Sequence, residues 1–425
     1  MARRGGPFQL LALVTPAAAD NTQVIGNGQA SCAPAIHEDT LVHTARGLIE
    51  AQHLIAEDMV FTLDLVTKAI LPTLPTTLVD IGSCQLIEVR VGTRTIRVTP
   101  DATFLALVDR RRPGRIRRRF KQEWIRAGDL KAHDIVGVAR KTPDLGVVRD
   151  LPCSDLMRDR RARGVKLPIR PDDDLMWWIG LYIGDGFVHH SGHRKRVEFA
   201  IPATQPDVRL ELIAVTASLF GVQARAKDEW RVVVPGIRIV DFVEAIGLGG
   251  TALRKRIPHW VYSSPESHRM GFLGGYVDAD GDVRAPGKRA RNKDMGLTSG
   301  NPALLEDARR LAVMCGVRTS SIWDFTSRHP FDRTRTITGY RMRFSGDFDR
   351  IPCRSERRII RMHQRKYFHN NTSVANLPLR SHASEWLGFA RVESVSLGGV
   401  HRAFVVPAER LVVEGVVVGL AAEHP

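Results

Sequence analysis

The sequence predicts an α+β protein in which a β-rich domain is split by an inserted domain made of two similar halves. Two patterns lead to this fold class. Short runs that alternate apolar and polar residues occupy both ends of the chain, which is typical of many short strands. The middle of the chain combines longer helical segments with paired strands, and several of its landmarks occur twice.

The charge of the chain favours a polyanionic partner. Its 425 residues suggest two or three domains at roughly 150 residues each. Lys and Arg number 62 against 46 Asp and Glu, a formal net charge of +16, which argues against an ordinary metabolic enzyme. The five cysteines contain no CxxC pair, so we expect a reducing compartment rather than a zinc cluster or a disulfide framework.

We expect residues 1–31 to form a loose N-terminal arm. Arg3 and Arg4 precede a short apolar run, and a triplet of alanines follows at Ala17, which gives the outline of a signal peptide. The apolar run is minimal, Pro16 interrupts it, and the remaining chain has the charge of a DNA-binding protein. The sequence therefore predicts a cytoplasmic protein, associated with the nucleoid through DNA. No membrane partner is expected, because no apolar run approaches the roughly 18 residues of a membrane helix.

Residues 32–140 are predicted to form the first part of the β-rich domain. Gly and Asp separate short runs with strand-like alternation. The predicted strands cover residues 40–44, 59–63, 86–91, 95–98 and 135–138. A basic run, Arg110–Arg119, is interpreted as a solvated loop that can also contact phosphates. Residues 141–170, which include three prolines, are predicted to be a polar linker.

Residues 171–370 contain an internal repeat. A proline in the first turn introduces two predicted helices, residues 206–220 and 302–315. Asp185 and Gly186 recur as Asp280 and Gly281, an offset of 95 residues. Other pairs share this offset: Gly180 and Gly275, Gly184 and Ala279, and residues 219–222 and 314–317. We infer two αββαββ-type units in pseudo-twofold relation, and hence a monomer with internal pseudo-symmetry.

The apolar segments 177–184 and 272–279 are predicted helices that pack against each other. Each carries two small residues four positions apart on one helix face: Gly180 and Gly184, and Gly275 and Ala279. Small residues on a shared face let two helix backbones approach closely. This packing would place Asp185 and Asp280 side by side at the C-terminal ends of the helices.

A pair of adjacent carboxylates predicts a metal site. Two carboxylates repel each other unless a cation lies between them. Mg2+ prefers oxygen ligands and assists phosphodiester hydrolysis, so we expect Mg2+, which Mn2+ can replace, at Asp185 and Asp280. Taken singly, each Asp-Gly pair would be interpreted as a helix C-cap with a surface acid. The matched pair in a basic chain favours the metal site.

The tail, residues 384–425, returns to strand-like runs at residues 404–406 and 410–418. Insertion at a surface loop is the tolerated way to nest one domain in another. The sequence therefore predicts that the two β-rich ends form one domain around the inserted unit.

Two segments resemble the LAGLIDADG signature of homing endonucleases. Residues 273–281, LGGYVDADG, are similar to it, and residues 178–186, WIGLYIGDG, are a looser copy. The resemblance implies that the acids at the eighth positions, Asp185 and Asp280, bind the metal ion. It also implies that the carbonyl groups of the preceding residues, Gly184 and Ala279, are additional ligands.

Residues 255–258, KRIP, are similar to the K-x-I-P element of the DOD-type endonucleases found in inteins. The resemblance implies that Lys255 polarises water or the scissile phosphate. The alternative is a surface lysine that contacts phosphate. No second lysine matches, and Arg354, Arg357 and Arg358 lie where one would be sought.

The flanking regions resemble the Hint fold of inteins, through residues 39–47, 95–105, 124–140 and 411–418. Splicing requires an N-terminal nucleophile, an activating histidine and a terminal asparagine. The positions that correspond to these groups are degenerate: Ala35 at the start, with Cys32 upstream of it, Ala102 in place of the histidine, and Gly419 and Leu420 in place of His-Asn. We therefore expect a splicing-defective intein.

Taken together, these features predict a site-specific, Mg2+-dependent endonuclease that cuts double-stranded DNA at a long recognition site and needs no small-molecule cofactor. The paired strands that follow each predicted acid are expected to form two saddles that lie along DNA. Basic residues beside these strands are expected to contact the DNA: Arg194, Lys195, Arg196, Lys288, Arg289 and Arg291. Two alternatives stay open, an intein active in splicing or self-cleavage and a DNA-binding protein that does not cleave. Four tryptophans are interpreted as core residues rather than base-stacking platforms: Trp177, Trp178, Trp230 and Trp260.

Overall fold

The computed structural model describes most of the chain from residue 33 onward. The described residues are 33–75, 78–110, 119–153, 156, 164–191, 194–283, 295–328, 334, 336–363, 382–408 and 410–420. The predicted N-terminal arm and residues 111–118 of the basic run lie outside them. Among the described helices, none combines the length and the apolar character that crossing a bilayer requires.

Strands from both ends of the chain form one 13-stranded sheet. The first ten are β1 (Ile36–His37), β2 (Leu41–Thr44), β3 (Gly47–Glu50), β4 (Val60–Leu63), β5 (Ile70–Thr73), β6 (Val79–Val91), β7 (Arg94–Val98), β8 (Thr103–Asp109), β9 (Phe120–Arg126) and β10 (Ile135–Ala139). The last three are β20 (Leu387–Val405), β21 (Leu411–Val413) and β22 (Val416–Gly419).

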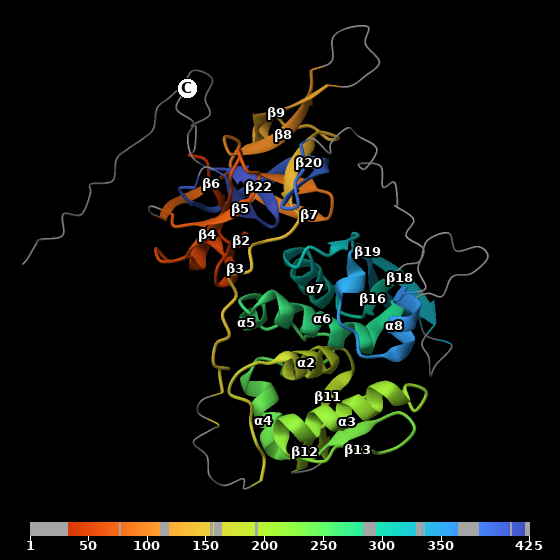
Figure 1. The fold of residues 1–425 in the computed structure, drawn as a ribbon. Coiled ribbons are helices and arrows are strands. Elements are labelled where there is room, and N and C mark those ends of the chain that lie inside the picture. The colour runs from red at the N-terminus through yellow and green to blue at the C-terminus, as the bar shows by residue number, and fades with distance from the viewer. Residues whose placement is uncertain are drawn as a thin grey trace, which may run out of the picture. The chain divides into compact units, whose positions relative to one another are not determined.

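The last strands lie inside this sheet rather than at its edge (Figure 1). The order is β1-β7-β6-β20-β10-β8-β22-β21-β2-β4-β5, with β3 on β2 and β9 on β8. β20 therefore separates β6 from β10, and β21 and β22 separate β2 from β8. Buried Val89, Val98, Phe104 and Val413 contribute to its core.

The strands β6 and β20 are much longer than the sequence predicted. They pair antiparallel from Val91 opposite Val392 to Val79 opposite Val405. The register shifts at three places along β20, each a bulge or an irregularity. Such shifts interrupt the alternation of apolar and polar residues, so the sequence predicted only short runs within these strands.

Two successive groups of helices and strands lie between β10 and β20. The first comprises α2 (Asp173–Asp185), β11 (Gly186–Ser191), β12 (Arg194–Phe199), α3 (Pro206–Phe220), β13 (Arg225–Ala226), β14 (Val232–Val234) and α4 (Ile237–Ala245). The second comprises α5 (His259–Tyr262), α6 (Glu266–Asp280), β15 (Gly281–Val283), β16 (Met295–Ser299), α7 (Pro302–Met314), β17 (Arg318–Thr319), β18 (Trp323–Arg328), β19 (Thr336–Gly346) and α8 (Glu356–His363). Their strands form a sheet of order β11-β12-β14-β13 and a second sheet of order β15-β16-β19-β17, with β18 on β19.

Local sequence signals explain where these helices begin and end. The Asp172 carboxylate caps α2 by accepting a hydrogen bond from the amide of Leu175 at 2.8 Å. Helix α3 covers the predicted residues 206–220 and ends at Gly221, whose φ of 66° suits a glycine. Helix α7 begins at the predicted proline, and the Asn301 side chain caps it. Gln205, the corresponding residue before α3, makes no side-chain cap.

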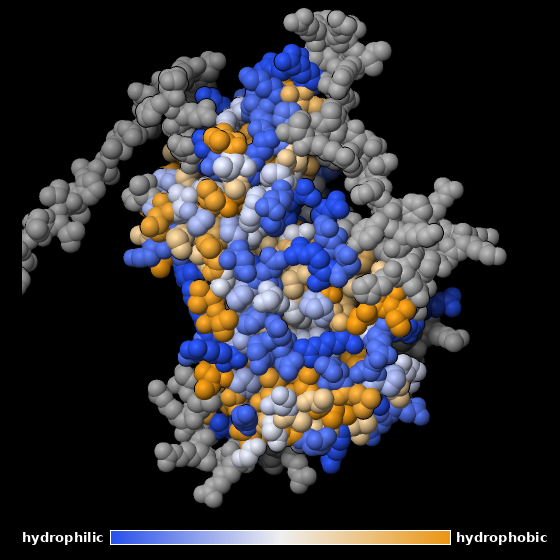
Figure 2. Space-filling view, viewed as in Figure 1, coloured by the Kyte–Doolittle hydropathy of each residue, from blue (hydrophilic) through white to orange (hydrophobic). Residues whose placement is uncertain are grey.

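The burial of the tryptophans corrects one prediction. Trp177 and Trp178 are buried as expected, and Trp260 packs partly buried against the core. Trp230 is instead 67% exposed, in the turn between β13 and β14. The prediction for Trp230 was wrong because its neighbours in sequence, Asp228 and Arg231, pair with each other and leave the indole ring in solvent. On the face shown in Figure 2, further hydrophobic side chains gather over the region of α3.

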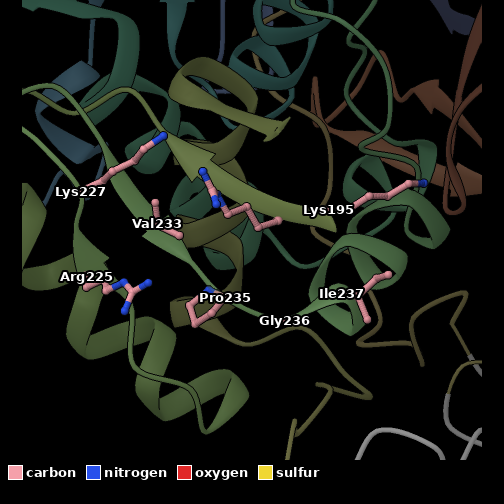
Figure 3. A pocket seen from close by; sticks show the side chains of 8 residues that line it. Lys195, Arg225, Lys227, Val233, Pro235, Gly236 and Ile237 are labelled. Carbon is pink, nitrogen blue, oxygen red and sulfur yellow. The ribbon is translucent and has the colours of Figure 1, made fainter. Parts of the chain in front are cut away.

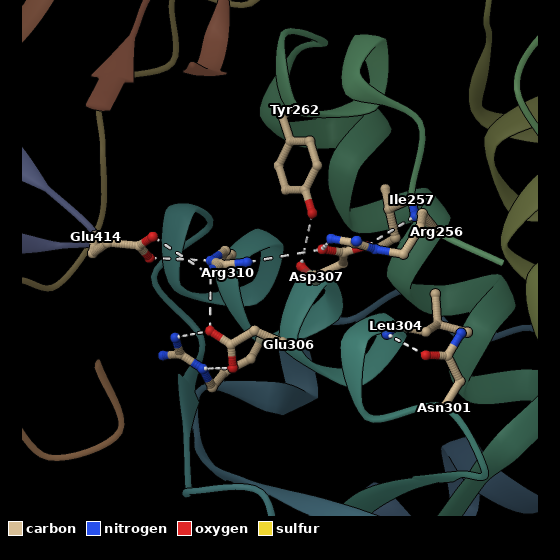
Figure 4. Close-up of polar contacts among 10 residues, drawn as sticks. Arg256, Ile257, Tyr262, Asn301, Leu304, Glu306, Asp307, Arg310 and Glu414 are labelled. Carbon is tan, nitrogen blue, oxygen red and sulfur yellow. Dashed lines mark hydrogen bonds and ion pairs between the residues drawn. The ribbon is translucent and has the colours of Figure 1, made fainter. Parts of the chain in front are cut away.

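A polar network extends from α7 to the turn between β21 and β22 (Figure 4). The Arg310 guanidinium donates to both carboxylate oxygens of Glu414, at 3.1 and 3.2 Å. The Asp307 carboxylate accepts two hydrogen bonds from Arg256, at 2.6 and 2.7 Å, and the Tyr262 hydroxyl donates to the Asp307 carbonyl oxygen. The network ties α7 both to the 13-stranded sheet and to the segment that holds Lys255.

Candidate active site

Helices α2 and α6 pack backbone to backbone at two glycines. A Cβ atom at Gly180 would lie 2.0 Å from the carbonyl oxygen of Phe272. A Cβ atom at Gly275 would lie 2.0 Å from the carbonyl oxygen of Trp177. Real atoms do not approach this closely, so the crossing exists only because neither position has a side chain.

The same crossing brings the C-terminal ends of the two helices together. A Cβ atom at Gly184 would lie 2.4 Å from the Ala279 Cβ and 3.0 Å from Oδ2 of Asp280. Asp185 is the last residue of α2, and Asp280 is the last residue of α6. Both helices stop there because the next residue, Gly186 or Gly281, is extended. Two carboxylates therefore share one location at the base of both small sheets.

The environment of these carboxylates favours their protonated forms. Burial raises the pKa of Asp185, the neighbouring Asp280 raises it further, and the cations Arg358 and Lys255 oppose both effects. Burial also raises the pKa of Asp280 against the same two cations. Without a bound cation, the pair therefore retains a proton well above the pH at which an exposed aspartate loses it.

Lys255 lies at the C-terminal end of α2. Its ammonium group donates hydrogen bonds to the carbonyl oxygens of Tyr182 at 2.7 Å, Ile183 at 3.1 Å and Gly186. Carbonyl groups at the C-terminal end of a helix carry partial negative charge, which favours a cation there. Burial lowers the pKa of Lys255 to about 8, although both aspartates oppose this shift. The ammonium is thus held beside the carboxylates. Its lowered pKa means that it begins to lose its charge not far above neutral pH.

Arg358 of α8 has the corresponding position at α6. Its guanidinium donates to the carbonyl oxygens of Ala279 at 3.2 Å and Gly281 at 3.1 Å. The sequence alone left three arginines open as partners of the second acid. The structure separates them: Arg354 pairs with Asp174 and Glu211, whereas Arg357 lines a cavity beside α6.

Asp278 is a residue of this site that sequence reasoning missed. Its side chain is fully buried and accepts hydrogen bonds from Trp177 Nε1 at 2.9 Å and from the amide of Arg354 at 2.7 Å. The amide of Ser355 also donates to it, at 3.3 Å. Asp278 thereby holds the segment that leads into α8 and Arg358. A signal was present in the sequence, because Asp278 lies within the LGGYVDADG motif, two residues before Asp280.

A cavity of about 410 Å³ opens next to the end of α6. Its lining includes Gly281, Asp282, Gln205, Asp207, Arg357 and Arg358. Residues from both halves of the middle region therefore border the same space. The cavity reaches Gly281, the residue that follows Asp280.

The oxygen ligands at this site fit a hard cation that takes only some of its ligands from the protein. Among the residues that the structure describes, no group of three or more His, Cys, Asp or Glu side chains is arranged to hold a metal. Two desolvated carboxylates with raised pKa values nevertheless meet at Asp185 and Asp280. Mg2+ commonly binds through one or two carboxylates and takes its remaining ligands from water and substrate phosphates.

The predicted DNA contacts are only partly described. Lys195 and Arg196 lie on β12, and both side chains are half-buried. The backbone of Arg194 begins that strand. The other three predicted contacts lie outside the described residues: Lys288, Arg289 and Arg291.

The four described splicing positions converge in the large sheet. Ala35 exchanges hydrogen bonds with Thr99, from its amide to Thr99 Oγ1 at 2.8 Å and from the Thr99 amide to its carbonyl oxygen at 2.9 Å. The amide of Ala102 donates to the Thr99 carbonyl oxygen at 3.1 Å, and Gly419 pairs with Thr103. Ala35, Ala102 and Leu420 are buried, whereas Cys32 lies outside the described residues.

Part of the chain matches a known family. Residues 267–323 match the family model of a LAGLIDADG-like domain. This span runs from the first turn of α6, through Asp280, to the start of β18.

Curated relatives share longer stretches. An iron-sulfur cluster assembly SufBD family protein of Mycobacterium leprae is 28% identical over 349 residues, which cover 79% of this chain and 39% of that protein. A DNA polymerase of Thermococcus kodakarensis is 30% identical over 133 residues, which cover 29% of this chain and 7% of the polymerase. The chain thus spans less than half the length of these relatives.

Solved structures with similarity include inteins and a homing endonuclease. The Ssp DnaB mini-intein variant M86 has a TM-score of 0.21 and 17% identity, and the match covers 26% of this chain and 63% of the intein. The homing endonuclease I-DmoI, in complex with DNA and calcium, has a TM-score of 0.26 and 18% identity, over 41% of this chain and 83% of the endonuclease.

Proposed function

We propose that this chain is a site-specific endonuclease of the LAGLIDADG homing type, of DOD subtype, which cuts both strands of DNA. The observation that carries the proposal is the pair Asp185 and Asp280. They end two helices that pack through Gly180 and Gly275, and a cation caps each helix end. The net charge of +16 supplies the attraction for a polyanionic substrate.

In this proposal Asp185 and Asp280 bind Mg2+, or Mn2+ in its place, and the Gly184 and Ala279 carbonyl groups add ligands. When bound, the ion stabilises the negative charge that develops on the phosphate and the leaving oxygen. The protein positions the duplex so that one phosphodiester of each strand reaches the carboxylate pair. Asp185 and Asp280 must lose their protons before the metal ion binds, because the ionised carboxylates attract the ion and the protonated acids do not.

Lys255 and Arg358 would act on the scissile phosphates from the two helix ends. Lys255 can polarise a phosphate or a water molecule, and near its pKa it can also exchange a proton. Arg358 supplies a fixed charge and hydrogen-bond donors only, because a guanidinium does not lose its proton in proteins. The two strands of the duplex would therefore be cut at different rates.

We further propose that the endonuclease is carried in an intein that has lost splicing. Coverage of less than half of each curated relative is consistent with an inserted element. Ala35 has no thiol or hydroxyl group to act as nucleophile, Ala102 has no imidazole group, and Leu420 has no amide that could cyclise. The 13-stranded sheet would then serve as a folded platform for the inserted unit.

The test is cleavage of a complex pool of duplex DNA with Mg2+ or with EDTA, followed by sequencing of the new ends. The proposal expects recurrent ends that require Mg2+ and disappear in the double variant Asp185→Asn, Asp280→Asn. Asp174→Asn is a control, because it neutralises one carboxylate at the opposite end of α2. If the protein retains DNA but no recurrent ends appear, the chain is a DNA-binding protein that does not cleave, and the endonuclease proposal fails.

A further inference from the structure

The carboxylate of Glu198 is buried on the open face of the first small sheet. Its neighbours on β12, Val197 and Phe199, are buried in the core. Because side chains alternate along a strand, Glu198 projects from the opposite face of the sheet. Among the described residues, the helices of the core pack on the side of Val197 and Phe199, yet the Glu198 side chain is 0% exposed.

Three cationic side chains cover this carboxylate. Glu198 Oε1 lies 2.8 Å from a guanidinium nitrogen of Arg196 and 3.1 Å from the ammonium of Lys227. Its Oε2 lies 3.5 Å from Arg231. Each of the three cations keeps about a third of its side chain exposed, at 33%, 31% and 38%. The cluster therefore shows positive charge to solvent and hides the negative charge beneath it.

Two of these cations, Arg196 and Lys227, border a cavity of about 470 Å³ (Figure 3). Its lining residues are Lys195, Arg196, Arg225, Lys227, Val233, Pro235, Gly236 and Ile237. Four of the eight are basic, and none is acidic. A phosphate group is the substrate element that this lining suits, because it can accept hydrogen bonds from several cations at once.

The buried carboxylate has a cost that the cations must offset. Burial opposes the ionisation of Glu198, and the hydrogen bonds from Arg196 and Lys227 outweigh it, so the pKa of Glu198 lies below its usual range. A buried charge of this kind stabilises little by itself, but it restricts where its partners can lie. Long, flexible Arg and Lys side chains otherwise lose conformational entropy when they bind.

We propose that Glu198 is a positioning residue, which holds Arg196 and Lys227 in place to bind a phosphodiester of duplex DNA at this cavity. The inference rests on the proposed function and adds one defined contact region to it. Phosphate contacts set the register of a protein on a duplex. Pre-ordered cations would therefore favour one register, and so the specific site over other sequences.

Removal of the carboxylate distinguishes positioning from a simple charge effect. A negative charge near the DNA path repels phosphates, so its loss alone tightens binding to every duplex. If Glu198 positions the cations, Glu198→Gln weakens binding to the specific site, although the protein becomes more positive. Glu244→Gln is the matched control, because Glu244 faces Lys195 of the same cavity, at 3.9 Å, and pairs with no second cation among the described residues that line it.

The experiment uses the full chain and two probes in EDTA, so that cleavage is not required. One probe is a duplex enriched from a random pool by retention on the wild-type chain, and the other is the same duplex with its sequence scrambled. For Glu198→Gln we expect affinity for the enriched duplex to fall roughly tenfold, with equal or tighter binding of the scrambled one. With Mg2+, KM for the enriched duplex should rise while kcat stays unchanged. Glu244→Gln should leave the affinity ratio as in the wild type.

Equal tightening of both probes by Glu198→Gln and Glu244→Gln would overturn the positioning role and leave the endonuclease intact. Retention of no duplex at all would overturn both proposals. If Glu198→Gln lowers the Tm, Arg196→Gln and Lys227→Gln replace it. Each should weaken the specific complex and lower the slope of log Kd against log salt by about 1. An unchanged slope in both would overturn the contact.

Discussion

Asp185 and Asp280 determine how the stability of the metal-free protein depends on pH. Both folded-state pKa values are raised above those of the unfolded chain, mainly by burial. The folded state then holds extra protons, so this contribution to stability is present at low pH and is lost as pH rises through the folded pKa values. In EDTA at pH 8, Asp185→Asn, Asp280→Asn should be more stable than the wild type by about 2 kcal/mol.

Chemical denaturation at pH 5 and pH 8 measures this difference, which should shrink at pH 5. An identical pH slope in the wild type and the double variant would show that the two carboxylates are not desolvated. Mg2+ at pH 8 should raise the Tm of the wild type and leave that of the double variant unchanged.

Lys255 and Arg358 are expected to affect different strands of the duplex. Each caps one of the two helix ends, through the carbonyl groups of Tyr182 and Ile183 or of Ala279 and Gly281. Lys255→Met and Arg358→Met should each accumulate nicked product, in opposite strands. The rate of cleavage of the affected strand should fall roughly 100-fold or more. Strand-specific end labelling measures both rates. Equal slowing of the two strands in either variant would contradict the assignment of one cation to each strand.

The sequence predicts the two acids and Lys255 because each belongs to a short local motif. Asp278 and Arg358 could not be assigned in the same way, since their roles depend on a contact between α6 and the segment that precedes α8. That contact joins residues far apart in the chain. The exposure of Trp230 also depended on a turn whose side-chain pairing the sequence does not specify.

At the scale of elements, the crossing of α2 and α6 depends on Gly275. Gly275→Ala would place a methyl group 2.0 Å from the Trp177 carbonyl oxygen and should lower the free energy of unfolding by about 3 kcal/mol. Gly271→Ala on the same helix is the control, because its methyl group would lie 3.5 Å from the Met176 Cβ, an ordinary contact. It should be neutral or stabilising by up to about 1 kcal/mol, as expected for alanine in a helix. Urea denaturation measures the free energy of unfolding of both variants. Equal changes in Gly275→Ala and Gly271→Ala would contradict the close packing at Gly275.

The helices were more predictable than the long strands. Capping residues and a first-turn proline delimit α3 and α7 locally. The lengths of β6 and β20 depend on pairing between residues some 300 positions apart, with register shifts that mask the alternation in sequence. Strand pairing of this range leaves little local signal.

For the whole molecule, the degenerate splicing positions predict a chemically inert chain. If Ala35, Ala102, Gly419 and Leu420 are the splicing positions, none of them offers a nucleophile, an imidazole group or a side-chain amide for the reaction. Intact-mass spectrometry of the full chain, placed between two reporter proteins and incubated for a day, should find one unchanged mass. Appearance of the joined reporters, or of either one released, would mean that other residues support the chemistry.

The position of β20 also constrains the order of folding. β20 is the neighbour of both β6 and β10. The first ten strands therefore cannot complete the sheet until the ribosome has passed residue 405. The small sheets and helices of the middle region draw on strands from within residues 186–346 and can form earlier. A nascent chain therefore exposes unpaired strand edges until β20, β21 and β22 have been made, and its tendency to aggregate should depend on how fast these strands follow.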